Sequence, residues 1–142
     1  MKKLLTLLFV LATLQIRAAG HTPIRIHTES TDLIYSIDGQ GRLCQSYFGP
    51  ALSDTTDLGL LAPGEGAFAT YGSGDYFTPA LRMTHHDGNT SLRLVYVSHD
   101  STPAADGATE TRILLRNEVY PVDVKLIFRA FEQENIIESR ME

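Results

Sequence analysis

Residues 122–129 read VDVKLIFR, and this stretch decides the class of fold. Val124, Leu126 and Phe128 occupy every second position. Because successive side chains of a β-strand point to opposite faces, a period of two indicates a strand with one buried face. We therefore predict a strand here, with Val124, Leu126 and Phe128 facing the core and Lys125 facing solvent.

The same alternation recurs on both sides of this stretch. Residues 33–48 predict a β-hairpin, because two alternating runs flank the turn Asp38-Gly39-Gln40-Gly41, where glycine reaches positive φ at low cost. The Asp87-Gly88 pair predicts a second hairpin between strands at 80–84 and 91–98. The remaining expectations are a polar loop at 99–109, a strand at 111–115 and a strand from Asn135 onward, inside which the sequence stops.

Residues 50–79 have a different character. Glycine and proline punctuate them, no period persists, and only residues 56–62 favour a helical turn. A loop of this length inside a compact domain is usually functional or covers a sheet edge. About seven short strands and no long helix together predict an all-β fold, specifically a β-sandwich.

Residues 1–20 predict a secretory signal peptide. Lys2 and Lys3 make a positive start, residues 4–14 form an apolar run, and Ala18-Ala19-Gly20 supplies small residues for cleavage. The run is too short to cross a bilayer as a helix. The alternative is a buried N-terminal helix, although such a helix should carry polar residues along one side. We expect an exported protein, periplasmic or extracellular, and not an integral membrane protein.

Residues 21–142 are then expected to form one acidic domain. The full chain has a net charge of −5, and losing Lys2, Lys3 and Arg17 with the signal peptide makes it −8. Nucleic acid and anionic lipid need positive surface, so neither is an expected partner. Cys44 is the only cysteine, which excludes an internal disulfide, and its apolar neighbours indicate a small buried residue.

Two groups of polar residues stand out without predicting a catalytic or metal site. His85 and His86 are adjacent, so on a strand they would point to opposite faces and could not easily share one ion. The long loop carries four carboxylates, a common feature of solvated loops: Asp54, Asp57, Glu65 and Asp75. No recognised catalytic or nucleotide-binding motif occurs. We expect no cofactor and no metal.

Four segments, in order, resemble the N-terminal domain of glycoside hydrolase family 36 α-galactosidases. The most specific is YGSGDYFTPA at 71–80, which resembles the family's Tyr-Gly-x-x-Asp-aromatic-x-x-Pro-Ala motif. Two departures leave the substrate preference open: residues 67–70 replace a frequent Glu-Tyr-Pro, and the segment after His99 is shorter than usual. The other resembling segments are 43–49, 92–99 and 122–126 with 134–140.

The resemblance implies a supersandwich, similar to galactose mutarotase, packed against a (β/α)8 barrel that would hydrolyse terminal α-galactosides with retention. Both catalytic carboxylates would lie in that barrel, so this chain alone is expected to be inactive. In some tetrameric relatives the long loop reaches a neighbour's active site, which makes Asp54 and Asp57 candidate substrate contacts. The chain would then be the accessory domain of an exported, homo-oligomeric α-galactosidase. The alternative is a free-standing carbohydrate-binding or cell-envelope interaction module.

Overall fold

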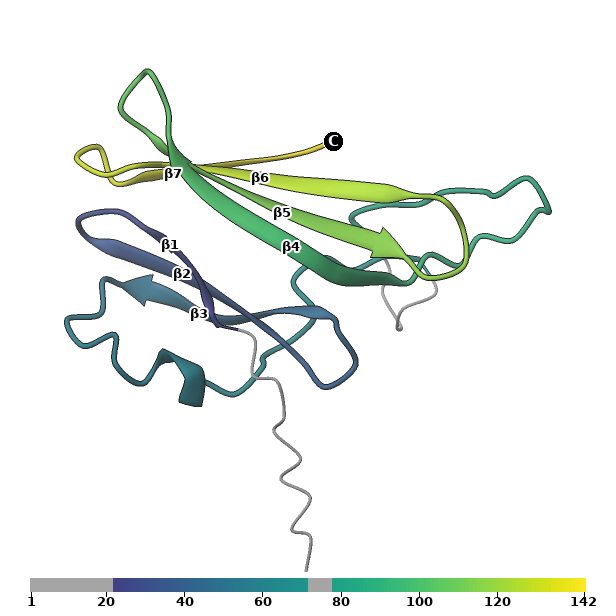
Figure 1. Ribbon diagram of the computed structural model, residues 1–142, viewed down its shortest axis with the longest axis horizontal. Helices are drawn as coiled ribbons and strands as arrows, with labels where there is room; N and C mark the ends of the chain where they lie inside the picture. The colour runs from purple at the N-terminus through teal and green to yellow at the C-terminus, as the bar shows by residue number, and fades with distance from the viewer. Residues whose placement is uncertain (1–21, 72–77) are drawn as a thin grey trace, which may run out of the picture.

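The computed structural model describes residues 22–71 and 78–142, which form two antiparallel β-sheets that face each other (Figure 1). The expected signal peptide lies outside the described residues. The first sheet has the order β1-β2-β3, with β1 at Ile24–His27, β2 at Thr31–Ile37 and β3 at Leu43–Pro50. The second has the order β4-β5-β6-β7, with β4 at Leu94–Pro103, β5 at Thr109–Asn117, β6 at Asp123–Phe131 and β7 at Ile136–Met141. The expected β-sandwich is confirmed.

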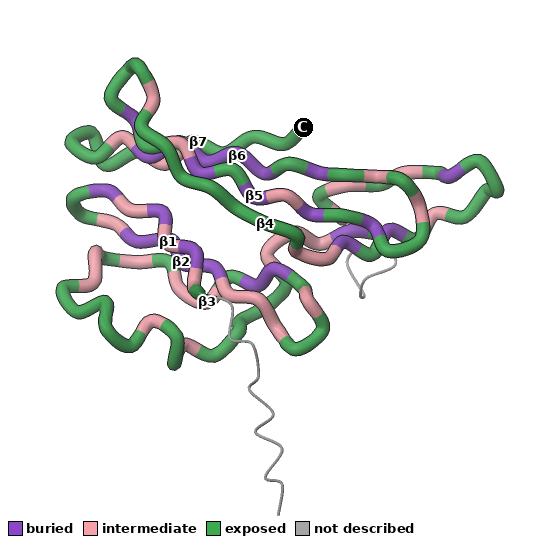
Figure 2. Tube along the Cα trace, in the orientation of Figure 1, coloured by how far each residue is buried: buried purple, intermediate pink, exposed green. Residues whose placement is uncertain are grey.

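The inner faces of the two sheets supply one apolar core. Val124, Leu126 and Phe128 of β6 are buried in it, whereas Lys125 is exposed, so the phase expected for this strand is confirmed. Tyr35 of β2 contacts Phe128 across the two sheets, with ring centroids 5.4 Å apart. In Figure 2 the buried residues concentrate along β1, β2, β5 and β6, whereas β4 at the edge of its sheet is largely exposed. Burial of apolar side chains therefore holds the sheets together.

The hairpin expected at 33–48 is confirmed as the antiparallel pair β2 and β3. Its turn has Gly41 at a φ of 77°, a conformation that glycine adopts at low cost. The Asp38 carboxylate closes the turn by accepting hydrogen bonds from the backbone N–H groups of Gln40 and Arg42, both at 2.8 Å. Turn chemistry and strand alternation agree here, which is why the sequence predicts this element well.

The hairpin expected between 80–84 and 91–98 is wrong in part. The turn forms, because Gly88 has a φ of 82° and donates its N–H to the carbonyl of His85. The flanking segments do not pair with each other, since both bond to a third segment instead. Leu81 makes a parallel bridge with Thr70, and Leu92 donates its N–H to the carbonyl of Tyr71. Residues 80–84 are consequently not a strand.

The loop expected at 99–109 is also wrong in part. β4 continues to Pro103 and β5 begins at Thr109, so the connection is a short turn in which Gly107 has a φ of 88°. β4 is the edge strand of its sheet, and its residues from Val97 onward are exposed on both faces. A strand without a buried face shows no apolar alternation, which explains why its polar sequence resembles a loop.

Candidate functional site

The long loop after β3 covers the outer face and the free edge of the first sheet (Figure 1). At the edge, Gln45 donates its N–H to the carbonyl of Glu65, and Ala67 donates its N–H to the carbonyl of Leu43. Gly64 lies so close to β3 that a Cβ there would collide with the carbonyl oxygen of Gln45. The loop therefore protects an edge strand, one of the two roles expected from its length.

The first residues of the loop are fastened to the sheet by a buried carboxylate. Asp32 of β2 is fully buried, and it accepts hydrogen bonds from Arg25 Nε at 2.7 Å and from the N–H of Leu52 at 2.7 Å. Burial raises the pKa of Asp32, but the hydrogen bonds, chiefly from Arg25 and Leu52, outweigh burial and hold the pKa below its ordinary value. Asp32 is therefore a buried anion that joins the sheet to the loop.

Asp54 and Asp57, the candidate substrate contacts, both lie exposed on this loop. Asp54 accepts hydrogen bonds from the N–H and the hydroxyl of Thr56, which lower the pKa of its carboxyl group. Asp57 precedes the 3-10 helix η1 at Leu58–Leu60, which confirms the helical turn expected within 56–62, and its side chain makes no capping hydrogen bond. Both carboxylates are exposed, and Oδ1 of Asp54 is engaged by Thr56.

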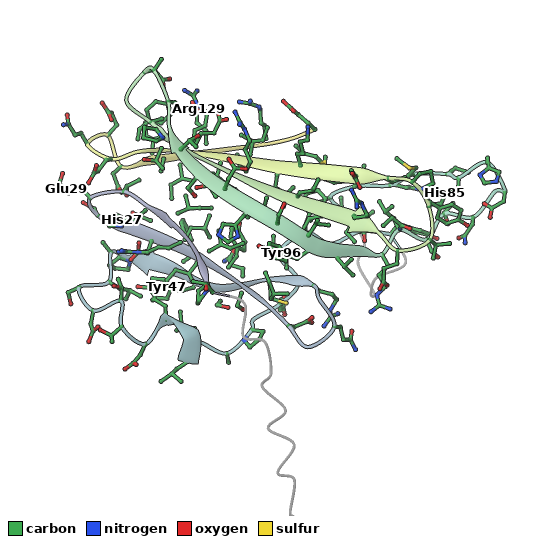
Figure 3. All side chains as sticks on the ribbon, in the orientation of Figure 1. His27, Glu29, Tyr47, His85, Tyr96 and Arg129 are labelled. Carbon is green, nitrogen blue, oxygen red and sulfur yellow. The ribbon has the colours of Figure 1, made fainter. Side chains whose placement is uncertain are left out.

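The histidines serve local structure. The ring of His85 stacks on Tyr120 at a centroid distance of 3.5 Å, and its Nε2 contacts the carbonyl of Ser91 at 3.0 Å. His99 Nδ1 lies 2.8 Å from the hydroxyl of Tyr96. His85 and His27 lie at opposite ends of the molecule (Figure 3). Within residues 22–71 and 78–142, no three histidine, cysteine or acidic side chains gather as a metal site would require.

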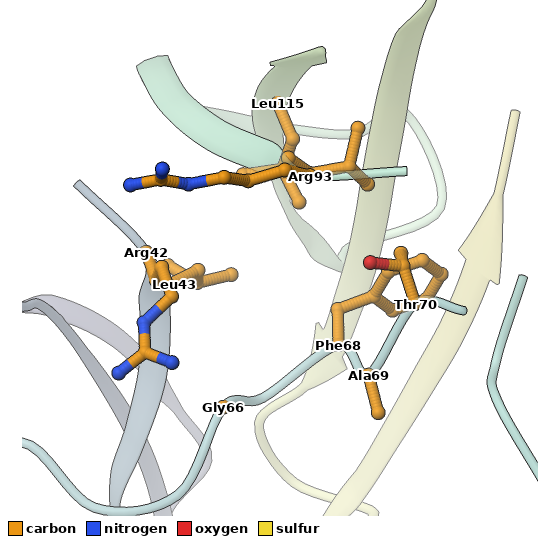
Figure 4. Close-up of a pocket in the computed structure, with 9 residues that line it drawn as sticks. Arg42, Leu43, Gly66, Phe68, Ala69, Thr70, Arg93 and Leu115 are labelled. Atoms are coloured by element: carbon orange, nitrogen blue, oxygen red, sulfur yellow. The ribbon is translucent and has the colours of Figure 1, made fainter. Parts of the chain in front are cut away.

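A small cavity opens between the two sheets near Arg42 and Arg93 (Figure 4). Its volume is about 30 Å³, which is room for roughly one water molecule and none for a sugar ring. Both guanidinium groups are paired, Arg42 with Asp38 at 2.7 Å and Arg93 with Glu118 at 3.2 Å. The cavity is therefore a packing feature.

Among residues 22–71 and 78–142, three larger hollows are open to solvent. One of about 160 Å³ has Glu132 as its sole carboxylate. One of about 300 Å³ is mainly apolar and has no carboxylate, and one of about 350 Å³ has only Glu138. A retaining glycosidase needs two carboxyl groups about 5–5.5 Å apart across one site. None of these three hollows meets that requirement.

Cys44 is buried as expected, and burial raises the pKa of its thiol. Asp75 and residues 72–77 of the most specific resembling segment lie outside the described residues. No helix in the described part of the chain is long and apolar enough to cross a membrane.

Two antiparallel sheets on one apolar core, with a long loop fastened over the outer face of one of them, define this chain as a β-sandwich domain. It belongs to glycosyl hydrolase family 36, because the sequence profile of the family's N-terminal domain matches residues 41–142. The family resemblance inferred from the four segments is thereby confirmed. A search of curated protein sequences found no significant match.

Solved structures with a similar fold include α-galactosidases. The enzyme from Lactobacillus brevis superposes with a TM-score of 0.69 at 18% identity, over 84% of this chain and 21% of that one. AgaA from Geobacillus stearothermophilus gives the same four values. The galactosidase domain of the α-galactosidase-sucrose kinase AgaSK gives a TM-score of 0.69 at 22% identity, over 82% of this chain and 21% of that one. The chain thus spans about one fifth of the structures it matches.

Proposed function

We propose that this chain is the N-terminal accessory domain of an exported α-galactosidase that removes terminal α-galactosides from oligosaccharides. The match of residues 41–142 to the family 36 N-terminal domain carries the proposal. It is supported by the α-galactosidases that share the fold. In this proposal the catalytic pair resides in a barrel elsewhere in the polypeptide.

The long loop is the part of the domain that would act on substrate. In a homo-oligomer, Asp54 or Asp57 would border the sugar site of a neighbouring subunit and accept hydrogen bonds from galactose hydroxyls. Exposure of both side chains on a loop that is fastened to the sheet supports this role. A hydrogen bond to a charged acceptor contributes about 1.5–3 kcal/mol, enough to change substrate affinity measurably.

Export rests on the pattern of residues 1–20 alone. A positive start, an apolar run and small residues before His21 are typical of a cleaved signal. The N-terminal sequence of the protein recovered from the producing cell tests this directly. A mature N-terminus near His21 in a periplasmic or extracellular fraction is expected, and an uncleaved Met1 in the cytoplasmic fraction would contradict it.

Sequencing the gene beyond the codon for Glu142 and assaying both products tests the enzyme assignment. We expect the reading frame to continue into a barrel, the complete protein to hydrolyse an aryl α-galactoside, and residues 21–142 alone to stay at the rate of a mock preparation. A stop codon followed by a stable, soluble product would favour a free-standing binding module instead. Steady hydrolysis by residues 21–142 would show that the chain holds its own catalytic site.

A further inference from the structure

The outer face of the first sheet carries a polar cluster that reaches the backbone of the long loop. Arg25 and His27 of β1 and Asp32 of β2 are neighbours across the strand pair, and all three lie on the loop side of the sheet. Asp32 is fully buried there, which is unusual for an aspartate unless partners surround it.

Four hydrogen bonds surround the Asp32 carboxylate. Arg25 donates from Nε to Oδ1 at 2.7 Å and from Nη2 to Oδ2 at 2.8 Å, the paired geometry that guanidinium and carboxylate favour. His27 Nδ1 lies 2.8 Å from Oδ1 and 3.1 Å from Arg25 Nη2. We assign the proton to this nitrogen because its shorter contact is to the carboxylate, which can only accept. The N–H of Leu52 supplies the fourth bond, at 2.7 Å to Oδ2.

Both backbone polar groups of Leu52 form hydrogen bonds with the cluster. Its N–H bonds to Asp32, and its carbonyl oxygen accepts from Arg25 Nη2 at 3.4 Å. The preceding residue is fixed as well, since Ala51 donates its N–H to the carbonyl of Ser30 at 2.9 Å. The direction in which the chain leaves the sheet is thus set two residues before Asp54.

We propose that Asp32 is the positioning residue of the long loop: its carboxylate fixes Leu52 and thereby the place at which Asp54 and Asp57 meet their ligand. Beyond Leu52, the hydrogen bonds of Asp54 within the described residues go to Thr56, its neighbour on the loop. The loop segment therefore takes its orientation from the cluster. The catalytic consequence rests on the proposed function, whereas the ordering of the loop does not.

Asp38 offers a matched control for Asp32. It lies just past the other end of β2, pairs with Arg42 at 2.7 Å and accepts two backbone N–H bonds, but none of its bonds reaches the loop. Replacing either aspartate by asparagine turns one accepting oxygen into an NH2 group. In Asp32→Asn the loop bond of Leu52 is lost when that group occupies the Oδ2 position, because two donors then face each other.

Hydrogen exchange of the protein as its gene encodes it tests the ordering of the loop. In Asp32→Asn we expect amides of residues 52–61 to exchange roughly tenfold faster or more, while amides of β5 and β6 keep their wild-type rates. Asp38→Asn should leave the loop at its wild-type rate. Unchanged loop exchange both in Asp32→Asn and in Leu52→Pro, which lacks the donated N–H, would overturn the proposal. Equal acceleration of the loop by Asp32→Asn and Asp38→Asn would overturn it as well.

Leu52→Pro provides a second test should Asp32→Asn also lose core protection. Proline removes the donated N–H and leaves the pairing of Arg25 with Asp32 in place. Faster exchange of residues 53–61 with an unchanged core is expected. Wild-type exchange in this variant would show that the bond to Asp32 does not order the loop.

Kinetics of the complete enzyme separate this proposal from the proposed function. If the double variant Asp54→Ala/Asp57→Ala raises KM for an α-galactoside, Asp32→Asn should raise KM too, with kcat retained. Combining Asp32→Asn with the double variant should raise KM no further. A raised KM in the double variant with an unchanged KM in Asp32→Asn would overturn the positioning role. An unchanged KM in the double variant would contradict the loop contact itself and leave the exchange experiment to decide on Asp32.

Discussion

The two faces of the first sheet are held in different ways. On the inner face, Leu33 and Tyr35 of β2 pack into the apolar core shared with the second sheet. On the outer face, Asp32 anchors the start of the long loop through the hydrogen bond from the N–H of Leu52. At the free edge of β3, the bridge between Cys44 and Gly66 anchors the far end of the loop. The same strand therefore contributes apolar packing on one side and directional bonds on the other.

This difference determines how each face responds to substitution. Apolar packing is non-directional and shared among many side chains, so its loss is felt as a change in the stability of the whole domain. The outer face depends on single groups in fixed places, so a change there should free the loop before it unfolds the sandwich. Substitutions on the two sides should consequently separate global stability from loop order.

The largest effect is expected at Phe128 on the inner face. Its side chain is 6% exposed and contacts Tyr35 of the opposite sheet. Phe128→Ala should lower the free energy of unfolding by about 3–5 kcal/mol, through lost burial and the cavity left behind. Lys125→Ala, on the exposed side of the same strand, should change it by less than about 0.5 kcal/mol. Equal losses in urea denaturation would contradict the burial of Phe128 in the core that the two sheets share.

A smaller effect is expected at Gly64, where the loop meets β3. A Cβ at this position would collide with the carbonyl of Gln45, so Gly64→Ala should cost about 1–3 kcal/mol and release the loop edge. The control is Gly59→Ala in η1, because nothing lies within 4 Å of the added Cβ. Faster exchange of the Gln45 amide in Gly64→Ala alone is the expected signature. Identical behaviour of the two variants would argue against close packing of the loop.

A still smaller effect concerns Tyr35 at alkaline pH. Burial raises the pKa of this phenol from 10.0 to about 12, because the charged form is poorly solvated in the core. Below pH 10 both folded and unfolded chains keep the proton, so this contribution is constant. As pH rises toward 12 the unfolded chain releases it first, and stability falls by about 1 kcal/mol at pH 11. In Tyr35→Phe, the free energy of unfolding should lack this fall between pH 8 and pH 11. A fall as large as that of the wild type would contradict the raised pKa of Tyr35.

The sequence predicts the inner face well because burial leaves a periodic trace. The alternation at 122–129 and at 33–48 gave the right strands with the right faces inward. β1 was missed, since four residues are too few for a period to emerge, although Ile24 and Ile26 alternate with Arg25 and His27. The strand predicted at 91–98 ended too early, because the exposed half of β4 has no apolar face.

For the outer face of the first sheet, the sequence predicted only that a loop of unusual length follows the hairpin. Neither the burial of Asp32 nor its bond to Leu52 leaves a pattern in the sequence, because the partners are separated along the chain and each contact involves a single group. The false strand at 80–84 has the same origin. Leu81 and Leu92 pair with residues 70–71, and nothing in their local sequence indicates a partner at that distance.

The most direct test of the account concerns the exposed end of the outer-face loop. Asp54→Ala and Asp57→Ala should be nearly neutral for folding, because both side chains are exposed. In the complete enzyme, the variant at the contacting position and the double variant should raise KM for an α-galactoside about tenfold, the loss of one charge-assisted hydrogen bond. Asp100→Ala, an exposed aspartate of β4, should leave KM unchanged. Wild-type KM in both single variants and in the double variant would contradict a substrate role for the loop and leave it as a cover for the edge of β3.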